Sequence, residues 1–119
     1  MRLETGTGGA VIAGTGTRAY LERALELRGL NGRERAEFIE YWAPKMECNP
    51  FNLIRFEGAD YERSARLTVD PAPDTVIRVF MTFARLGFPV SVLDQPQPAS
   101  PPARRGFTVV EWGGRELVD

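Results

Sequence analysis

The fold of this chain is decided by the stretch FIEYWAPKMECNPFNLI, residues 38–54. In its first half, four apolar residues recur at the i, i+3, i+4, i+7 spacing of an amphipathic helix: Ile39, Trp42, Ala43 and Met46. Pro44 has no backbone N–H to donate, so the helix is expected to kink or end there. Beyond the Asn49-Pro50 turn, alternating residues predict a strand over 51–57. A helix that feeds a strand is therefore the centre of the predicted fold.

A helical hairpin is predicted upstream of this stretch. The sequence NGRE, residues 31–34, has the pattern of a capping box that opens the second helix. Thr17 is predicted to be the N-cap of a first helix that runs to about Arg28 and stops at Gly29. The short connection makes the two helices antiparallel. Residues 10–13, AVIA, predict one short buried strand before them.

Strands are predicted downstream of the stretch. Residues 75–85 form the strongest candidate, and apolar groups on both of its faces favour a central position in a sheet. Shorter strands are expected over 65–70, 90–93 and 107–112. Residues 95–105 are rich in proline and predict an extended surface loop. The fold class is therefore α+β, with an N-terminal helical hairpin packed on a mostly antiparallel β-sheet.

Length and composition restrict the function classes. A chain of 119 residues predicts a single domain, 1–119, with a variable and flexible N-terminal segment over 1–15. The formal net charge of -1 gives no field that would gather nucleic acid or an anionic membrane, so neither is expected as a partner. Histidine is absent, which removes the commonest general base and metal ligand. We expect no metal and no cofactor.

Cysteine usage and the first residues bear on location. Cys48 is the single cysteine, so no disulfide can form within the chain. No run of residues is long and apolar enough to predict a membrane span, which indicates a soluble protein. Residues 1–4 do not resemble the start of a signal peptide, so a cytoplasmic location is expected by default.

Arg78 and Glu111 form the first candidate site. Arg78 lies between Val76 and Phe80 on an otherwise apolar strand face, where a charge needs a partner. Glu111 lies on another predicted strand and is the candidate partner. We favour a structural ion pair over a ligand-binding arginine.

Aromatic residues form the second candidate site. Trp42 and Trp112 could present a platform to a sugar or a peptide, although core positions are favoured for both. Tyr41, next to Trp42 in the sequence, is a further candidate ligand residue. Glu37 and Glu40 lie on the same helical flank as Tyr41 and predict a solvated face rather than acid–base chemistry. The turn GTGT, residues 14–17, could offer amides to a phosphate, but it lacks the P-loop ending and predicts a tight turn.

Three segments of the chain resemble a family of uncharacterised bacterial proteins. They are EFIEYWAPKM with NPFNLI (residues 37–46 and 49–54), PDTVIRVFM (residues 73–81) and GFTVVEWGG (residues 106–114). The resemblance spans roughly residues 16–117. It implies no activity, because none is known to us for the family. It does imply that longer relatives carry a strand-rich half upstream, often behind a secretion signal, and that this chain corresponds to the C-terminal half.

The sequence leaves three hypotheses of function open. The favoured one is a non-catalytic binding or structural domain that presents a surface to a protein or glycan partner, or to a second copy through an exposed sheet edge. The alternative is a carboxylate-based hydrolase that uses Glu37, Glu40 and Glu111 with Arg78. A nucleotide-binding module at residues 14–17 is the weakest hypothesis. A pocket that gathers Arg78, Glu111 and Tyr41 would favour the enzyme.

Overall fold

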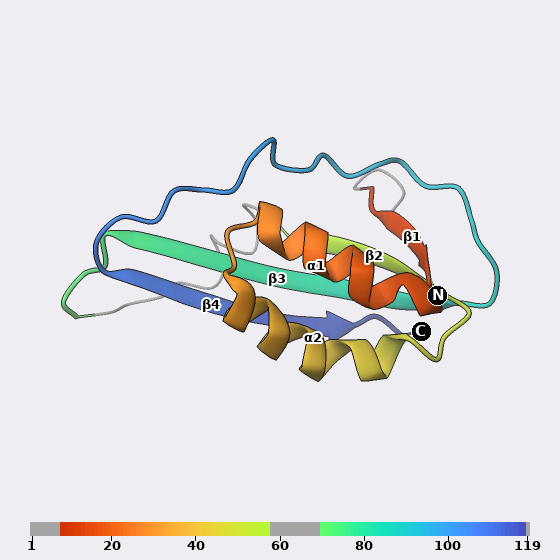
Figure 1. Cartoon of the computed structure of the whole chain (residues 1–119). Helices are drawn as coiled ribbons and strands as arrows, with labels where there is room; N and C mark the ends of the chain where they lie inside the picture. The colour runs from red at the N-terminus through yellow and green to blue at the C-terminus, as the bar shows by residue number, and fades with distance from the viewer. Residues whose placement is uncertain (1–7, 58–69, 119) are drawn as a thin grey trace.

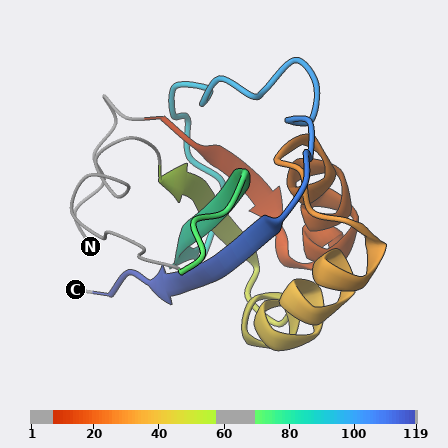
Figure 2. The same ribbon diagram turned by 90° about the vertical axis from the view of Figure 1, so that its left-hand side faces the viewer.

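Two helices cover one face of a four-stranded sheet, as Figures 1 and 2 show. The computed structural model describes residues 8–57 and 70–118 of the chain. The helices are α1 (Thr17–Leu27) and α2 (Gly32–Met46). The strands are β1 (Ala10–Ala13), β2 (Phe51–Glu57), β3 (Thr75–Leu86) and β4 (Thr108–Glu116). The predicted α+β class, with its helical pair on the sheet, is confirmed.

The sheet has the strand order β1-β2-β3-β4. The pairs β1/β2 and β2/β3 are antiparallel, whereas β3 and β4 are parallel. The predicted central position of β3 is confirmed. The connection from β3 to β4, residues 87–107, contains no helix and returns along the β1 side of the sheet past α1 (Figure 1). We call its proline-rich part, residues 95–105, the strap.

Local signals end helix α1 and begin helix α2 in the short connection between them. Asn31 accepts a hydrogen bond from the Glu34 N–H at 2.9 Å, and Glu34 Oε1 accepts one from the Asn31 N–H at 2.8 Å, so the predicted capping box is present. Gly29 ends α1 with a φ of 98°, a left-handed conformation that glycine adopts without strain. Helix α2 continues through Pro44 and ends two residues later, at Met46.

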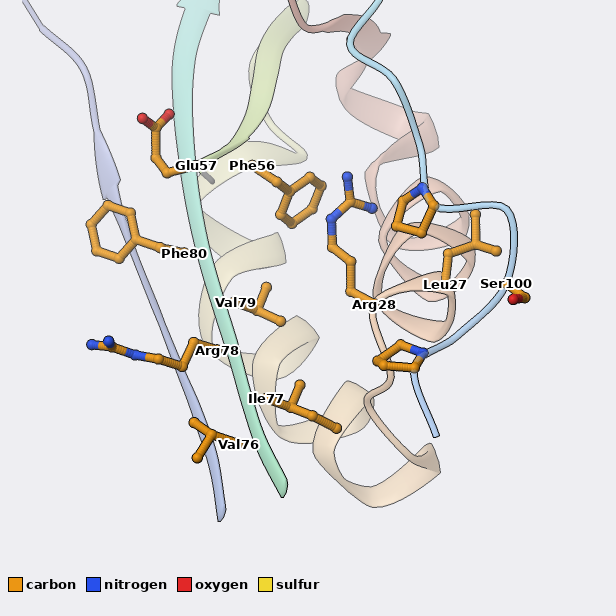
Figure 3. Close-up of a pocket in the computed structure, with 12 residues that line it drawn as sticks. Leu27, Arg28, Phe56, Glu57, Val76, Ile77, Arg78, Val79, Phe80 and Ser100 are labelled. Carbon is orange, nitrogen blue, oxygen red and sulfur yellow. The ribbon is translucent and has the colours of Figure 1, made fainter. Parts of the chain in front are cut away.

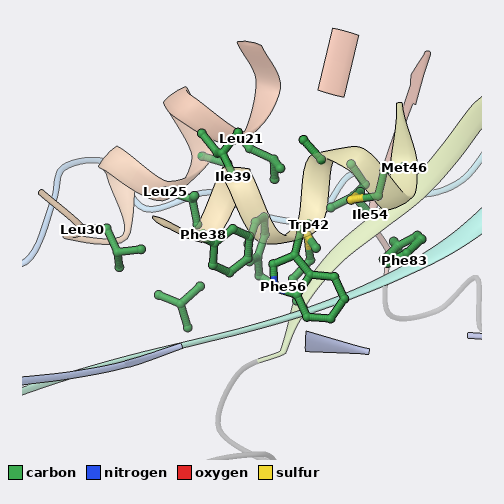
Figure 4. Packing of buried hydrophobic residues seen from close by; sticks show 14 of the residues in the cluster. Leu21, Leu25, Leu30, Phe38, Ile39, Trp42, Met46, Ile54, Phe56 and Phe83 are labelled. Carbon is green, nitrogen blue, oxygen red and sulfur yellow. The ribbon is translucent and has the colours of Figure 1, made fainter. Parts of the chain in front are cut away.

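The core lies between the helices and the sheet (Figure 4). The predicted stripe of α2 is buried throughout, and it packs on the face of β3 that carries Ile77, Val79, Met81 and Phe83. Asn52 is fully buried as well. Its Nδ2 donates to the Met46 carbonyl at 2.9 Å and its Oδ1 accepts from Asn49 Nδ2 at 2.8 Å, which fixes the turn from α2 into β2.

Several local predictions were wrong. Gly14–Gly16 forms a short 3-10 turn, so Gly16 takes the N-cap position, and the buried Thr17 hydroxyl donates to the Gly14 carbonyl at 2.7 Å. Residues 90–93 form no strand; only a bridge between Gly9 and Asp94 lies beside them. Strand β4 starts one residue later than expected and continues to Glu116. The strand expected over 65–70 lies outside the described residues, apart from Asp70 in a bend.

Candidate functional site

Arg78 and Glu111 meet, as the sequence predicts. They are direct neighbours in the parallel register of β3 and β4. Arg78 Nε and Nη2 both lie 2.8 Å from Glu111 Oε1. The Arg78 side chain is only 9% exposed, while that of Glu111 is 38% exposed. The geometry is that of an ion pair at the rim of the sheet face that points away from the helices.

Tyr41, Trp42 and Trp112 also come together, on the helix side of the sheet. The rings of Tyr41 and Trp42 are 4.9 Å apart edge to face, and those of Tyr41 and Trp112 are 6.2 Å apart. The ring centres of Phe38 and Trp112 are 5.1 Å apart, so Phe38 extends the aromatic group toward the core. Only Tyr41 is largely exposed, at 53%, and Lys45 Nζ lies 4.6 Å from its ring centre.

The two tryptophans differ in depth. Trp42 is 8% exposed, so its predicted core position is confirmed, while Trp112 is partly buried against the same core. The Trp42 indole packs over Gly114 of β4, where a Cβ would come within 2.9 Å of the ring. The buried Trp42 Nε1–H has no hydrogen-bond partner among the described residues. Gly114 therefore lets α2 approach β4 closely.

The five predicted ligand residues form two separate groups on opposite faces of the sheet. Arg78 and Glu111 lie on one face; Tyr41, Trp42 and Trp112 lie on the other. Figure 3 shows Arg78 on the opposite side of β3 from Ile77 and Val79. No single pocket in the described part of the chain gathers Arg78, Glu111 and Tyr41. The arrangement that would favour the enzyme is absent there.

The carboxylates of the helical flank pair with arginines at the surface. Arg18 Nη1 lies 3.3 Å from Glu40 Oε1, and Arg18 Nε lies 3.0 Å from Glu47 Oε2. Arg33 Nε lies 3.9 Å from Glu37 Oε1. The Arg18 hydrogen bond lowers the pKa of Glu47. A low pKa is the opposite of what a general acid at neutral pH needs. The arrangement fits the predicted solvated face.

The turn at residues 14–17 packs against other backbone. The Gly14 N–H donates to the Pro50 carbonyl at 3.1 Å, and a Cβ on Gly14 would overlap the Asn49 carbonyl. This glycine is therefore required for the close approach of two turns. The amides of Gly14 and Thr17, which a phosphate at this turn could use, already bond within the fold.

A cleft beneath the strap was not predicted from the sequence (Figure 3). Its volume is about 400 Å³, and it lies where the strap passes over the C-terminal end of α1 and the first half of β3. The Arg28 side chain extends into it beside Phe56. The only sequence signal was a charged residue at a helix end, where a basic side chain is expected for the helix dipole alone.

The outer edge of β4 is an exposed edge of the sheet, which the sequence does not specify. Strand β4 pairs with β3 on one side, and no described strand pairs with its other side. The Phe107 carbonyl accepts from the Thr75 N–H, and the Leu117 N–H donates to the Phe83 carbonyl, so the backbone groups of Phe107 and Leu117 face β3. Because N–H and C=O groups alternate in direction along a strand, those of Val110, Trp112 and Gly114 point to the outer side.

Comparison with protein-family models, with curated proteins and with solved structures found no match to this chain. The helices of the described part are too short or too polar to cross a membrane. No group of three potential metal-ligating side chains of histidine, cysteine, aspartate or glutamate occurs within residues 8–57 and 70–118. The function must therefore be argued from the geometry.

Proposed function

We propose that this protein is a non-catalytic binding domain that accepts an extended segment of a protein partner on the outer edge of β4. The observation that carries the proposal is the nine-residue strand Thr108–Glu116, which pairs on one side only among the described strands. An unpaired edge of this length offers a row of backbone donors and acceptors. Strand addition to such an edge is a common mode of peptide recognition.

The side chains beside this edge favour an apolar anchor. An added strand would lie alongside α2, and every second side chain would face the helix. Trp112 is half-buried there, and Tyr41 is exposed above it. An aliphatic or aromatic side chain opposite Trp112 would contact both rings. Burial of such a side chain contributes roughly 1.5–3 kcal/mol.

The same geometry favours a peptide over a glycan. A sugar platform requires a ring with one face open to solvent, but Trp42 is buried and Trp112 is partly covered. Tyr41 has Lys45 over its ring. A backbone edge with adjacent aromatic side chains matches an extended polypeptide better. No described arrangement favours the carboxylate-based hydrolase.

The proposal is tested by selecting linear peptides from a displayed library and mapping the binders by amide chemical-shift changes. Val110→Pro removes one outward N–H and leaves the inward ladder to β3 intact, because proline is tolerated at such edge positions. We expect this variant to lose at least about tenfold in peptide affinity. Val110→Ala keeps the N–H while trimming the side chain, and it should retain most of the binding.

Two outcomes would change the assignment. Peptides that bind equally well to Val110→Pro, or that shift no amide of β4, would overturn it. Concentration-dependent dimerisation that Val110→Pro abolishes would replace the partner peptide with a second copy of this chain. Melting curves of both variants establish that each is folded before binding is compared.

A further inference from the structure

Arg28 is a partly buried cation with no ion pair among the described residues. Six other arginines in the described part of the chain each lie within 4.0 Å of a carboxylate: Arg18, Arg33, Arg35, Arg55, Arg78 and Arg104. Within residues 8–57 and 70–118, Arg28 makes one hydrogen bond, from Nη1 to the Ala24 carbonyl at 2.9 Å. A guanidinium has five N–H donors, so most of its capacity is left over.

The surroundings of Arg28 make the lack of an ion-pair partner among the described residues costly. Its guanidinium carbon lies 3.9 Å from the centre of the Phe56 ring. Burial lowers the pKa of Arg28, and the nearby Tyr20 only partly opposes this effect. Desolvation without a counter-charge disfavours the charged form of a cation. A bound anion would supply the counter-charge that the described residues do not provide.

The space beside Arg28 is bounded by a fixed strap. At one end the Gln95 side chain bonds to the backbone of Phe56; at the other, Arg104 Nη2 donates to the Gly29 carbonyl at 2.8 Å and also pairs with Glu34. The prolines between these two anchors stiffen the chain. The strap therefore spans the cleft instead of filling it, and a volume of about 400 Å³ remains.

The walls of the cleft are largely apolar on the side of Arg28. They include Leu27, Phe56, Ile77, Val79, Pro98 and Pro102. Glu57 and Arg78 also border the cleft, but both are engaged elsewhere. Glu57 Oε2 accepts from Thr82 Oγ1 at 3.2 Å and lies 3.5 Å from Arg55 Nη2, and Arg78 pairs with Glu111 Oε1 at 2.8 Å on the other side of β3. In Figure 3 the Glu57 carboxylate lies across β3 from the Arg28 guanidinium.

We propose that the cleft beneath the strap is a binding site for an organic carboxylate with an apolar tail. The Arg28 guanidinium binds the carboxylate, and the apolar tail lies against Phe56, Ile77 and Val79. An apolar pocket with one charged group that fixes orientation is the usual form of a small-ligand site. The pairing is favoured because an arginine fork matches the two oxygens of a carboxylate. Carboxylate binding here does not rest on the proposed peptide site, because the cleft is bordered by α1, β2, β3 and the strap, whereas the peptide would add to the outer edge of β4.

Sodium hexanoate is the probe, titrated at constant ionic strength while the methyl resonances of Ile77 and Val79 are followed. Hexanamide has the same tail without the charge, and inorganic phosphate has charge without the tail. We expect saturable shifts with hexanoate and at least about tenfold weaker binding of hexanamide. Arg28→Gln should weaken hexanoate binding by a similar factor, and Arg28→Lys by less. The exposed Arg33→Gln is the matched control and should bind hexanoate as the wild type does.

Three results would overturn the proposal. Equal affinity for hexanamide and hexanoate would mean that the tail alone binds. Equal shifts with phosphate would mean that the cleft takes any anion. Unchanged hexanoate binding by Arg28→Gln would place the anion elsewhere. If Arg28→Gln does not fold, the hexanoate and hexanamide titrations of the wild-type protein still decide the matter.

Discussion

The side-chain amide of Gln95 pairs with the backbone of Phe56 as a neighbouring strand would. Gln95 Oε1 accepts from the Phe56 N–H at 2.9 Å, and Gln95 Nε2 donates to the Phe56 carbonyl at 2.6 Å. The last β1 partner on β2 is Ile54, opposite Ala10. One side chain of the strap thus extends the hydrogen bonding of β2 beyond the end of β1.

Gln95→Ala should lower the free energy of unfolding by about 1–3 kcal/mol, because two backbone groups of Phe56 lose their partners. Amide exchange at Phe56 should accelerate, and chemical denaturation measures the global cost. Gln97→Ala is the matched control, since the one side-chain hydrogen bond of Gln97 in the described part of the chain goes to the Gln95 carbonyl within the strap. Equal effects of the two substitutions would show that the amide pairing does not hold the strap.

Arg78 and Glu111 should show coupled stability. Removal of either partner leaves a charge on a mostly apolar face, whereas removal of both does not. In a double-mutant cycle with Arg78→Met and Glu111→Gln, we expect the double variant to cost less than the sum, by about 1 kcal/mol. Denaturation curves of the four proteins measure this coupling. Strict additivity would contradict it.

Local signals explain which parts of the fold could be predicted from the sequence. The capping box of Asn31 and Glu34 and the stop at Gly29 involve residues within one helical turn, so sequence spacing is sufficient. The apolar groups on both faces of β3 likewise indicated a central strand. Thr17 misled because an N-cap signal takes no account of the 3-10 turn before it, which already begins the helical path.

Long-range contacts explain the remaining errors. Residues 90–93 are mostly apolar, but strand formation depends on a partner with matching register, and the described structure offers these residues none. The parallel pairing of β4 was not foreseen, because such a crossover usually contains a helix and residues 87–107 contain none. The Arg28 cleft depends on the strap, whose path is set by anchors at Phe56 and Gly29.

Among the candidate site residues, the Arg78–Glu111 pair was predictable because each charge lies on an apolar strand pattern and needs a partner. The meeting of Tyr41 with Trp112 was not, because no local spacing relates α2 to β4. Gly114 permits that meeting through its contact with Trp42. The glycine alone carries no such information in the sequence.

Glu34 should make stability depend on pH. Burial raises its pKa, but hydrogen bonds from Arg104 and from the Asn31 N–H outweigh that effect, and the net pKa lies below the ordinary value of 4.5. A carboxylate with a depressed folded-state pKa stabilises the fold above its unfolded pKa. That stability is lost as the pH falls through the folded pKa.

Glu34→Gln should therefore be less stable than the wild type at neutral pH, and the difference should shrink as the pH falls below about 4.5. Urea denaturation at a series of pH values measures it. Glu37→Gln is the control, because Glu37 pairs only loosely with Arg33 at 3.9 Å. A difference between Glu34→Gln and the wild type that stays constant down to low pH would contradict this assignment.

Trp42 and Trp112 should differ in their contribution to stability. Trp42 is 8% exposed between α2 and the sheet, so Trp42→Ala should cost about 3–5 kcal/mol, enough to unfold a domain of this size. Trp112 is only partly buried, and Trp112→Ala should cost less and leave a folded protein.

Fluorescence of single-tryptophan variants tests the same order of burial without loss of the fold. In Trp112→Phe, the remaining Trp42 should emit at short wavelength and resist acrylamide quenching. In Trp42→Phe, Trp112 should be quenched more strongly, and peptide bound at β4 should protect it. If Trp42 proved the more accessible of the two, the packing of α2 over Gly114 would be wrong, and the peptide contact proposed at Trp112 would have to be abandoned with it.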